Sequence, residues 1–157
     1  MNLRIGFGYD LHLLAKDRKL ILGGIEIESP FGLIGHSDGD VLIHSIIDSL
    51  FGAFSLGDIG THFPDYDPAY KGISSLVLLE ETTDKIPGSV VNIDATIVAE
   101  VVKLFPYFDS MKENIARIIG INESSISIKA TTNEGVGPVG EKKAIACYCI
   151  SLCKEGI

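Results

Sequence analysis

The segment that follows residue 40 constrains the fold most, because its apolar side chains recur at the spacing of an α-helix. These side chains are Ile43, Ile46, Ile47, Leu50, Phe51 and Phe54. Such a stripe predicts a helix that packs one face against a core. Ser37, followed three residues later by Asp40, fits a capping box and predicts Ser37 as the N-cap of this helix. Glycine, aspartate and proline between residues 57 and 68 are typical of a loop that follows it.

Strand-like and helical segments alternate along the rest of the chain. We expect strands at residues 3–9, 19–27, 90–98, 125–131 and 144–152, and helices at 72–86 and 106–120. No linker or repeat interrupts this pattern. It predicts one domain over residues 1–157, of the α/β (α+β) class, in which a mixed sheet carries helices on one face.

The chain is acidic, since 21 Asp and Glu outnumber 13 Lys and Arg to give a formal net charge of −8. Such a protein repels nucleic acid, and an anionic ligand would need a local positive field from metal ions or helix N-termini. No apolar run could span a bilayer, and residues 1–9 lack the pattern of a signal segment. Cys147, Cys149 and Cys153 form no CxxC pair and are typical of small apolar residues in a reduced protein. We therefore expect a cytoplasmic protein without nucleic-acid or membrane partners.

Two segments carry side chains suited to one metal ion. Asp10 and His12 are two residues apart, so in a strand they point to the same face. Asp40, His44 and Asp48 form a polar stripe on the expected helix. One carboxylate and two imidazoles with an open position are the donors of a catalytic zinc site, and Asp48 is a candidate to fix the tautomer of His44. Spacing alone also allows a solvated polar stripe, because nothing local brings strand and helix together.

Three further stretches have an equally open interpretation. His36 precedes the expected helix, where it could meet an anion at the N-terminus or be a simple loop residue. The loop at 57–67 could bind a polyol through Asp58, or be an Asp-rich turn without a ligand. Residues 131–134 could hold phosphate oxygens, with Mg²⁺ on Glu134, or be an ordinary strand end.

Taken together, these segments resemble the cyclodiphosphate synthase family of the non-mevalonate isoprenoid pathway. The most specific stretches are HSDGD at residues 36–40, LGDIGxxFPDxDP at 56–68 and KATTxE at 129–134. Further matching stretches are residues 4–12, 22–24 and 93–99, together with His44. They follow the family's order and cover nearly the whole chain.

The resemblance implies a phosphorus–oxygen lyase that acts on 4-diphosphocytidyl-2-C-methyl-D-erythritol 2-phosphate. The 2-phosphate attacks the β-phosphorus, which closes 2-C-methyl-D-erythritol 2,4-cyclodiphosphate and releases CMP. It also implies a zinc site and a second site for Mg²⁺ or Mn²⁺. Zinc would bind Asp10, His12 and His44, and the second ion Glu134. His36 and Thr132 match the pair that aligns and stabilises the transition state.

Substrate contacts are implied on three segments. The methylerythritol and its phosphates would meet Ser37, Asp58, Ile59, Gly60, Phe63, Pro64, Asp65, Tyr66 and Asp67. The cytosine pocket would be formed by Ala99, Glu100, Val101, Val102, Lys103, Leu104 and Phe105, and the diphosphate would meet Thr131 and Asn133.

The resemblance further implies a homotrimer with active sites at the subunit boundaries. The metal ligands would come from one subunit, and the cytidine pocket with residues 131–134 from the next. Val102 replaces a proline that is frequent in the family, and Pro138 and Glu141 depart from the family's cavity-lining loop. We therefore expect the trimer cavity not to hold an isoprenoid diphosphate.

Two other function classes are compatible with a metal site of this kind. A metal-dependent phosphoesterase would use water as the nucleophile and give a linear product. A non-catalytic metal-binding trimer would hold zinc for structure alone. The full set of motifs favours the cyclising enzyme over both.

Overall fold

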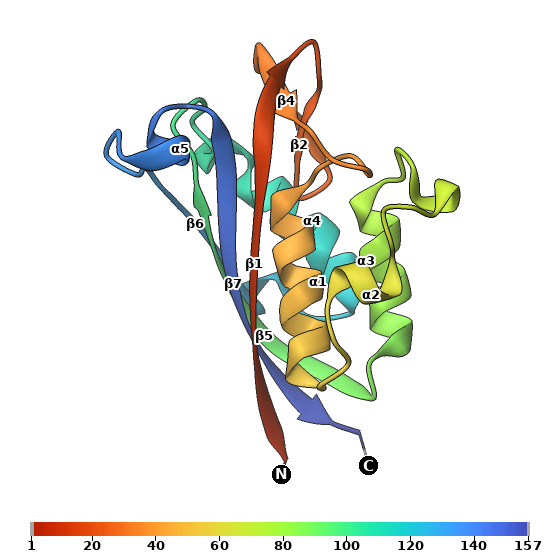
Figure 1. The fold of residues 1–157 in the computed structure, drawn as a ribbon. Coiled ribbons are helices and arrows are strands. Elements are labelled where there is room, and N and C mark those ends of the chain that lie inside the picture. Colours follow the sequence, from red (N-terminus) through yellow and green to blue (C-terminus); the bar gives the residue numbers. More distant parts are fainter. Residues whose placement is uncertain (1, 157) are drawn as a thin grey trace.

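A five-stranded mixed sheet carries the other elements of the fold, in a computed structural model that describes residues 2–156 (Figure 1). The strand order is β4-β1-β7-β5-β6. The strands are β1 (Leu3–Lys16), β4 (Phe31–Leu33), β5 (Gly88–Val98), β6 (Ile126–Thr131) and β7 (Ala144–Glu155). Neighbours are antiparallel except for the parallel pair β5 and β6. A separate hairpin joins β2 (Leu20–Leu22) to β3 (Ile25–Ile27).

Three helices cover one face of this sheet, as Figure 1 shows. They are α1 (Val41–Ala53), α3 (Ser75–Lys85) and α4 (Phe108–Ile119). Shorter turns are α2 (Ile59–His62), α5 (Gly137–Gly140) and the 3₁₀ segments Pro68–Tyr70, Phe105–Tyr107 and Glu123–Ser125. The α/β sheet with helices on one face is therefore confirmed. No helix within residues 2–156 has the length and apolar character needed to cross a bilayer.

Helix α1 lies unusually close to strand β1. Ile43, Ile46 and Leu50 on its inner face are fully buried, as the stripe predicted. A methyl group added at Gly6 would lie 1.7 Å from the Ser49 carbonyl oxygen, so only glycine leaves room for the helix backbone there. The two elements that carry the predicted metal ligands are thus held in direct contact.

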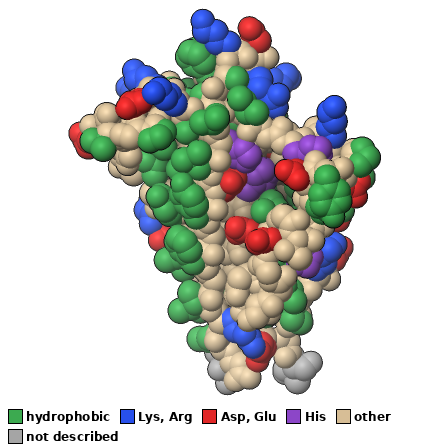
Figure 2. Space-filling model, in the orientation of Figure 1, with side chains coloured by type: hydrophobic (Ala, Val, Ile, Leu, Met, Phe, Trp, Pro, Cys, Tyr) green, Lys and Arg blue, Asp and Glu red, His purple; other side chains and the backbone are tan. Residues whose placement is uncertain are grey.

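The opposite face of the sheet leaves large apolar side chains exposed. We call this the open sheet face. It consists of Leu3, Ile5, Phe7, Tyr9 and Leu13 on β1 with Tyr148 and Ile150 on β7. Figure 2 shows apolar side chains in a continuous column along this edge of the molecule. A contiguous apolar surface on a folded chain is typical of an interaction site.

Several predicted boundaries differ from the structure. Strand β1 continues to Lys16, so Asp10 lies inside it, not after it. The strand expected at residues 19–27 is the hairpin of β2 and β3, which turns where Gly23 and Gly24 have φ values of 59° and 71°. Helix α1 begins at Val41 with Asp40 as its N-cap, so the prediction of Ser37 as N-cap was wrong. The Asp40 side chain itself accepts the Ile43 N–H at 3.1 Å, which leaves the Ser37 hydroxyl free for another contact.

Candidate metal centre and substrate pocket

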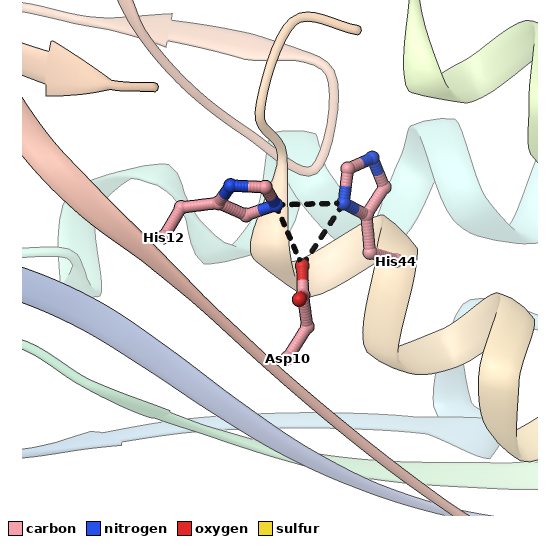
Figure 3. A group of neighbouring side chains, drawn as sticks. All are labelled: Asp10, His12 and His44. Atoms are coloured by element: carbon pink, nitrogen blue, oxygen red, sulfur yellow. Dashed lines mark hydrogen bonds and ion pairs between the residues drawn. The ribbon is translucent and has the colours of Figure 1, made fainter. Parts of the chain in front are cut away.

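Asp10, His12 and His44 converge where α1 starts above β1. Asp10 and His12 follow Gly6 and Gly8 at every second residue of β1, so all four face the helix. Asp10 Oδ2 lies 3.0 Å from His12 Nε2 and 2.9 Å from His44 Nδ1, and the two nitrogens are 3.2 Å apart (Figure 3). The structure therefore brings together the three residues predicted to hold the first metal ion.

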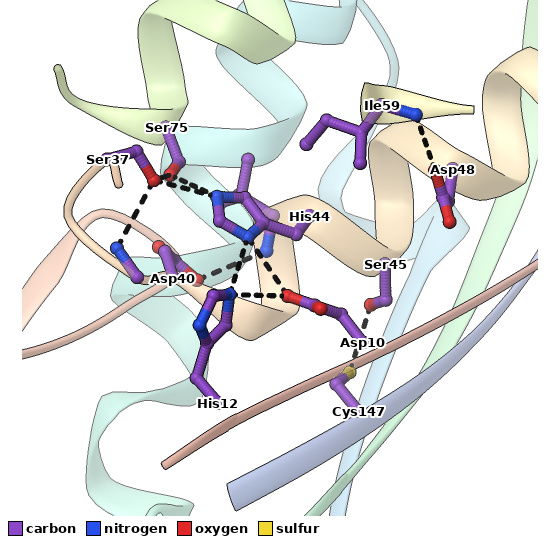
Figure 4. A network of polar contacts seen from close by, with 12 residues as sticks. Asp10, His12, Ser37, Asp40, His44, Ser45, Asp48, Ile59, Ser75 and Cys147 are labelled. Atoms are coloured by element: carbon purple, nitrogen blue, oxygen red, sulfur yellow. Dashed lines mark hydrogen bonds and ion pairs between the residues drawn. The ribbon is translucent and has the colours of Figure 1, made fainter. Parts of the chain in front are cut away.

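The nitrogen on the far side of each imidazole also has a partner. His12 Nδ1 lies 2.5 Å from the Ile34 carbonyl oxygen. A carbonyl oxygen only accepts, so Nδ1 carries a proton. In the neutral ring Nε2 then has the lone pair that a metal ion would bind, and in the protonated ring Nε2 donates to Asp10. His44 Nε2 lies 2.9 Å from Ser75 Oγ and 3.0 Å from Ser37 Oγ (Figure 4).

The prediction that Asp48 contacts His44 and fixes its tautomer was wrong. Asp48 lies on α1 but points away from the imidazole, and its carboxylate accepts the Ile59 N–H at 2.8 Å (Figure 4). Two serines take the place that was expected for it. Ser75 is 31 residues from His44 and gives no local signal, so sequence analysis missed it.

The charges of the centre reinforce one another. Burial raises the pKa of Asp10, but hydrogen bonds and charges from His12 and His44 outweigh it and hold that pKa well below the usual value. Burial lowers the pKa of His12, but the hydrogen bond and the negative charge of Asp10 raise it by more. The pKa of His12 is therefore above its usual value. Asp10 is therefore ionised at neutral pH and draws positive charge toward itself.

The donor set fits a divalent cation. One ligand atom from each of Asp10, His12 and His44 lies within 4.8 Å of the others. One carboxylate oxygen and two imidazole nitrogens are common zinc ligands, and three protein ligands leave a coordination position for a substrate oxygen. These three residues can thus hold a metal ion that also binds an oxygen of a substrate.

A pocket of about 390 Å³ opens beside this centre. Figure 2 shows it as a hollow in which histidine and acidic side chains gather. It is lined by Asp10, His12, His36, Ser37, His44, Ile59, Gly60, Phe63, Pro64, Asp65, Tyr66, Tyr70 and Leu78. Most predicted methylerythritol contacts lie here, together with Tyr70 and Leu78, which carried no recognisable sequence signal.

Two predicted contacts of this loop have local roles. Asp58 caps α2, because its carboxylate accepts the Thr61 N–H at 2.8 Å and the Thr61 hydroxyl at 2.7 Å. These bonds lower the pKa of the exposed Asp58 carboxyl. The Asp67 carbonyl lies 3.1 Å from His36 Nε2 and fixes that ring at the pocket wall.

The remaining predicted site residues gather at another edge of the sheet. Strands β5 and β6 are parallel and end side by side, with Val98 opposite Thr131. The predicted cytosine segment, 99–105, and the predicted diphosphate segment, 131–134, therefore leave the sheet together. None of these residues lines the pocket beside Asp10. Within one chain, the candidate site is divided into two groups.

Glu100 connects the two segments of this second group. Its carboxylate accepts the Asn133 N–H at 2.8 Å and the Gly135 N–H at 3.5 Å. Glu134 between them has a φ of 50°, an uncommon conformation for a residue other than glycine. Its carboxylate accepts a hydrogen bond from the Thr132 hydroxyl at 3.3 Å. Glu100 therefore shapes the turn that presents Glu134.

Residues 3–154 match the family described as YgbB. The chain belongs to the YgbB family. Among its YgbB relatives, the 2-C-methyl-D-erythritol 2,4-cyclodiphosphate synthase of Clostridium novyi is 54% identical over 98% of this chain and 99% of its own length. The synthase of the same name from Desulforamulus reducens is 50% identical over 98% of this chain and 100% of its own length.

Solved structures show the same fold. The bifunctional IspDF of Campylobacter jejuni matches 99% of this chain with a TM-score of 0.94 and 38% identity, and this chain spans 43% of that longer protein. A Plasmodium falciparum IspF, described as a CDP complex, matches 99% of this chain and 98% of its own, with a TM-score of 0.84 and 35% identity. The YgbB fold of this chain is thus shared over almost its whole length.

Proposed function

We propose that the protein converts 4-diphosphocytidyl-2-C-methyl-D-erythritol 2-phosphate to 2-C-methyl-D-erythritol 2,4-cyclodiphosphate and releases CMP. An oxygen of the 2-phosphate attacks the β-phosphorus, and the bond from that phosphorus to the bridging oxygen breaks, so CMP leaves with that oxygen. The main support for this proposal is the cluster of Asp10, His12 and His44 at the wall of a pocket. The names of close relatives support this reaction, and the CDP described with a neighbour supports a cytidine ligand.

The chain's own residues mainly bind and orient the substrate. His36 and Ser37 line the pocket beside His44, where they can align the reacting phosphates. Ile59, Gly60 and the loop up to Tyr66 enclose the space in which the methylerythritol would lie. Phosphoryl transfer depends chiefly on such positioning and on neutralised charge.

This acidic chain would bind an anionic substrate with the help of metal ions held by its own residues. When bound, zinc at Asp10, His12 and His44 and Mg²⁺ or Mn²⁺ at Glu134 would neutralise the diphosphate and polarise its phosphorus–oxygen bonds. Thr132 lies within hydrogen-bond distance of Glu134 and would stabilise the transferred phosphoryl group from the same side.

A homotrimer would join the two groups of site residues. Within one chain, the pocket beside Asp10 lies apart from segments 99–105 and 131–134. A second copy of the chain would complete the site by placing its own two segments next to this pocket. The open sheet face offers the surface for this contact, because Ile5 and Phe7 at its centre are 73% and 61% exposed. Burial of such side chains is the main stabilising term in permanent oligomers.

Phosphorus NMR of the purified protein with the proposed substrate, Zn²⁺ and Mg²⁺ tests the reaction directly. The expected products are a cyclic diphosphate and CMP, and His44→Ala should abolish both. Asp84→Asn, on the exposed side of α3, is a matched control that should retain activity.

Each other outcome of that experiment points to a different function. CMP with a linear phosphate product would replace the proposal with a phosphoesterase. An unchanged substrate spectrum from a metal-loaded, intact oligomer would indicate a binding protein.

A further inference from the structure

We propose that Asp38 is a positioning residue which, through Ser75, fixes the proton of His44 on Nε2 and so presents Nδ1 to the metal ion. The inference rests on the proposed metal site, but concerns residues outside the ligand set. Ser75 is fully buried at the start of α3, and Asp38 lies in the segment before α1.

The direction of the hydrogen bonds follows from the chemistry of the groups. Ser75 donates its hydroxyl proton to Asp38 Oδ1, and its backbone N–H donates to Asp38 Oδ2 at 2.9 Å. An ionised carboxylate only accepts, and a serine hydroxyl has a single proton. The proton of Ser75 is therefore committed to Asp38, and its oxygen faces His44 Nε2 as an acceptor at 2.9 Å.

The tautomer of His44 is the consequence. An acceptor at Nε2 favours a proton on Nε2, which leaves the lone pair on Nδ1. Ser37 Oγ lies 3.0 Å from Nε2 and 3.4 Å from Ser75 Oγ, so it can accept from Nε2 while its own proton points to the Ser75 oxygen. Nδ1 is the nitrogen that lies 2.9 Å from Asp10 and 3.2 Å from His12 Nε2. Both imidazoles of the centre are thus oriented from outside, His12 by the Ile34 carbonyl and His44 by the Ser75–Asp38 pair.

Backbone contacts hold this pair in place. The Asp38 N–H donates to the Ile73 carbonyl at 3.1 Å, and the Gly72 N–H donates to the His36 carbonyl at 2.7 Å. The segment before α1 and the segment before α3 are therefore joined on both sides of the Asp38 side chain. They hold the Asp38 carboxylate next to Ser75, and the Ser75 hydroxyl cannot turn away from His44 without losing its bond to Asp38.

Asp38→Asn is the sharpest test, because it changes the hydrogen-bond direction without changing volume. In this variant the side-chain oxygen would accept the Ser75 N–H, and the new amide nitrogen would donate to the Ser75 hydroxyl. Ser75 could then donate to Nε2, which favours the proton on Nδ1, where the metal should bind. Loss of such an outer partner typically lowers metal affinity by about 10- to 100-fold.

The measurement is zinc affinity of the assembled protein, by competition with a chromophoric chelator. We expect Asp38→Asn to lower affinity by about 10- to 100-fold and Ser75→Ala to lower it as well. Because Asp38 acts through Ser75, the double variant should match Ser75→Ala within about twofold. Ser74→Ala is the matched control: it removes the hydroxyl that caps α3 at Leu76 but has no contact with His44, and should bind zinc normally.

Nitrogen-15 NMR of the metal-free protein near pH 8 provides a second readout that needs no turnover and no zinc. Without metal, Ser75 favours a proton on His44 Nε2 and the Asp10 carboxylate favours one on Nδ1. Asp38→Asn removes the first preference, so it should shift the tautomer population from Nε2 toward Nδ1. Unchanged zinc affinity and tautomer in Asp38→Asn, or a double variant in which the two losses multiply, would overturn the inference. Loss of cyclisation with these results intact would instead count against the proposed function alone.

Discussion

Gly8 and Ser45 touch through their backbones: a methyl group at Gly8 would lie 1.9 Å from the Ser45 carbonyl oxygen. This contact sets the distance between β1 and α1, and with it the distance from Asp10 to His44. Neither atom at the contact is a flexible side-chain end, so an added methyl group must move the helix.

Gly8→Ala should therefore weaken both stability and metal binding. We expect a loss of about 1–3 kcal/mol in the free energy of unfolding, or more, from overpacking, with substoichiometric zinc after purification. Denaturation followed by circular dichroism and metal analysis measure the two effects. Gly52→Ala is the control, because its methyl group would meet only the Phe7 carbonyl oxygen at 3.7 Å. It should be neutral or stabilise the helix by up to ~1 kcal/mol, and native zinc content in Gly8→Ala would contradict this account.

The buried N-cap of α1 predicts a specific pH dependence. Burial, together with the charge of Asp38, raises the pKa of Asp40 to about 6 in spite of the hydrogen bonds it accepts. In the unfolded chain the pKa is about 4. Between these values the folded state holds the proton more tightly, so stability falls as pH rises from 4 through 6.

Comparison with Asp40→Asn isolates this contribution. As pH rises from 4 through 6, the metal-free protein with Asp40 should lose roughly 3 kcal/mol of unfolding free energy relative to the metal-free Asp40→Asn variant. Asp84→Asn, which removes an exposed carboxyl, controls for the change in net charge. A difference that stays constant from pH 4 to 7 would show that Asp40 ionises normally.

Much of the fold could be predicted because its signals are local. The buried stripe of α1 and the glycine that ends α4, Gly120 with a φ of 76°, follow from spacing and backbone conformation within a few residues. Strand β4 was not predicted, since three residues at a sheet edge carry too short a pattern. The capping signal at Ser37 was misleading because Asp40 caps the helix more directly.

The site was predictable in part for the same reason. Asp10 and His12 share a strand face, so their proximity follows from spacing, whereas their meeting with His44 required the tertiary contact at Gly8. Ser75 could not be recognised, because a serine at a helix start is ordinary and its role depends on a chain segment 31 residues away.

Phe7→Glu should dissociate the proposed trimer. The change puts a charge in the middle of the open sheet face, beside Tyr148, whose ring centroid lies 6.4 Å away. A charge buried without a partner opposes association strongly. Light scattering should give the mass of a monomer, while Val77→Glu, at an exposed position of α3, should keep that of the trimer. A trimeric Phe7→Glu protein would place the interface elsewhere.

Mixing two inactive variants tests whether sites are shared between subunits. His44→Ala lacks the pocket group and Glu134→Ala lacks the strand-end group. Trimers refolded from an equal mixture should regain part of the activity, because some boundaries combine an intact His44 with an intact Glu134. Cyclisation assays on the mixture and on each variant alone give the comparison, and no recovery in mixed trimers would mean that each chain builds its own site.

Glu100 should act on substrate binding through the turn at Glu134. Glu100→Ala removes the acceptor of the Asn133 and Gly135 N–H groups, and a hydrogen bond to a charged group contributes about 1.5–3 kcal/mol. We expect KM to rise about tenfold or more, and a higher Mg²⁺ concentration to be needed for full activity. Glu100→Gln keeps one side-chain oxygen as an acceptor and should retain most of the activity that Glu100→Ala loses. Steady-state kinetics over a Mg²⁺ series measure this. A fall in zinc affinity with unchanged KM would refute the assignment.

The three cysteines lie on the core side of β7, and Cys147 is paired with Asp10 where β7 runs beside β1. Burial raises the pKa of all three thiols, and the Ser45 hydroxyl donates to Cys147 Sγ at 3.1 Å. A protonated, enclosed thiol neither captures zinc nor reacts with alkylating reagents. Labelling of these thiols therefore requires a local opening of the structure. The rate at which an alkylating reagent labels Cys147 measures how often β7 separates from α1 next to the metal ligands.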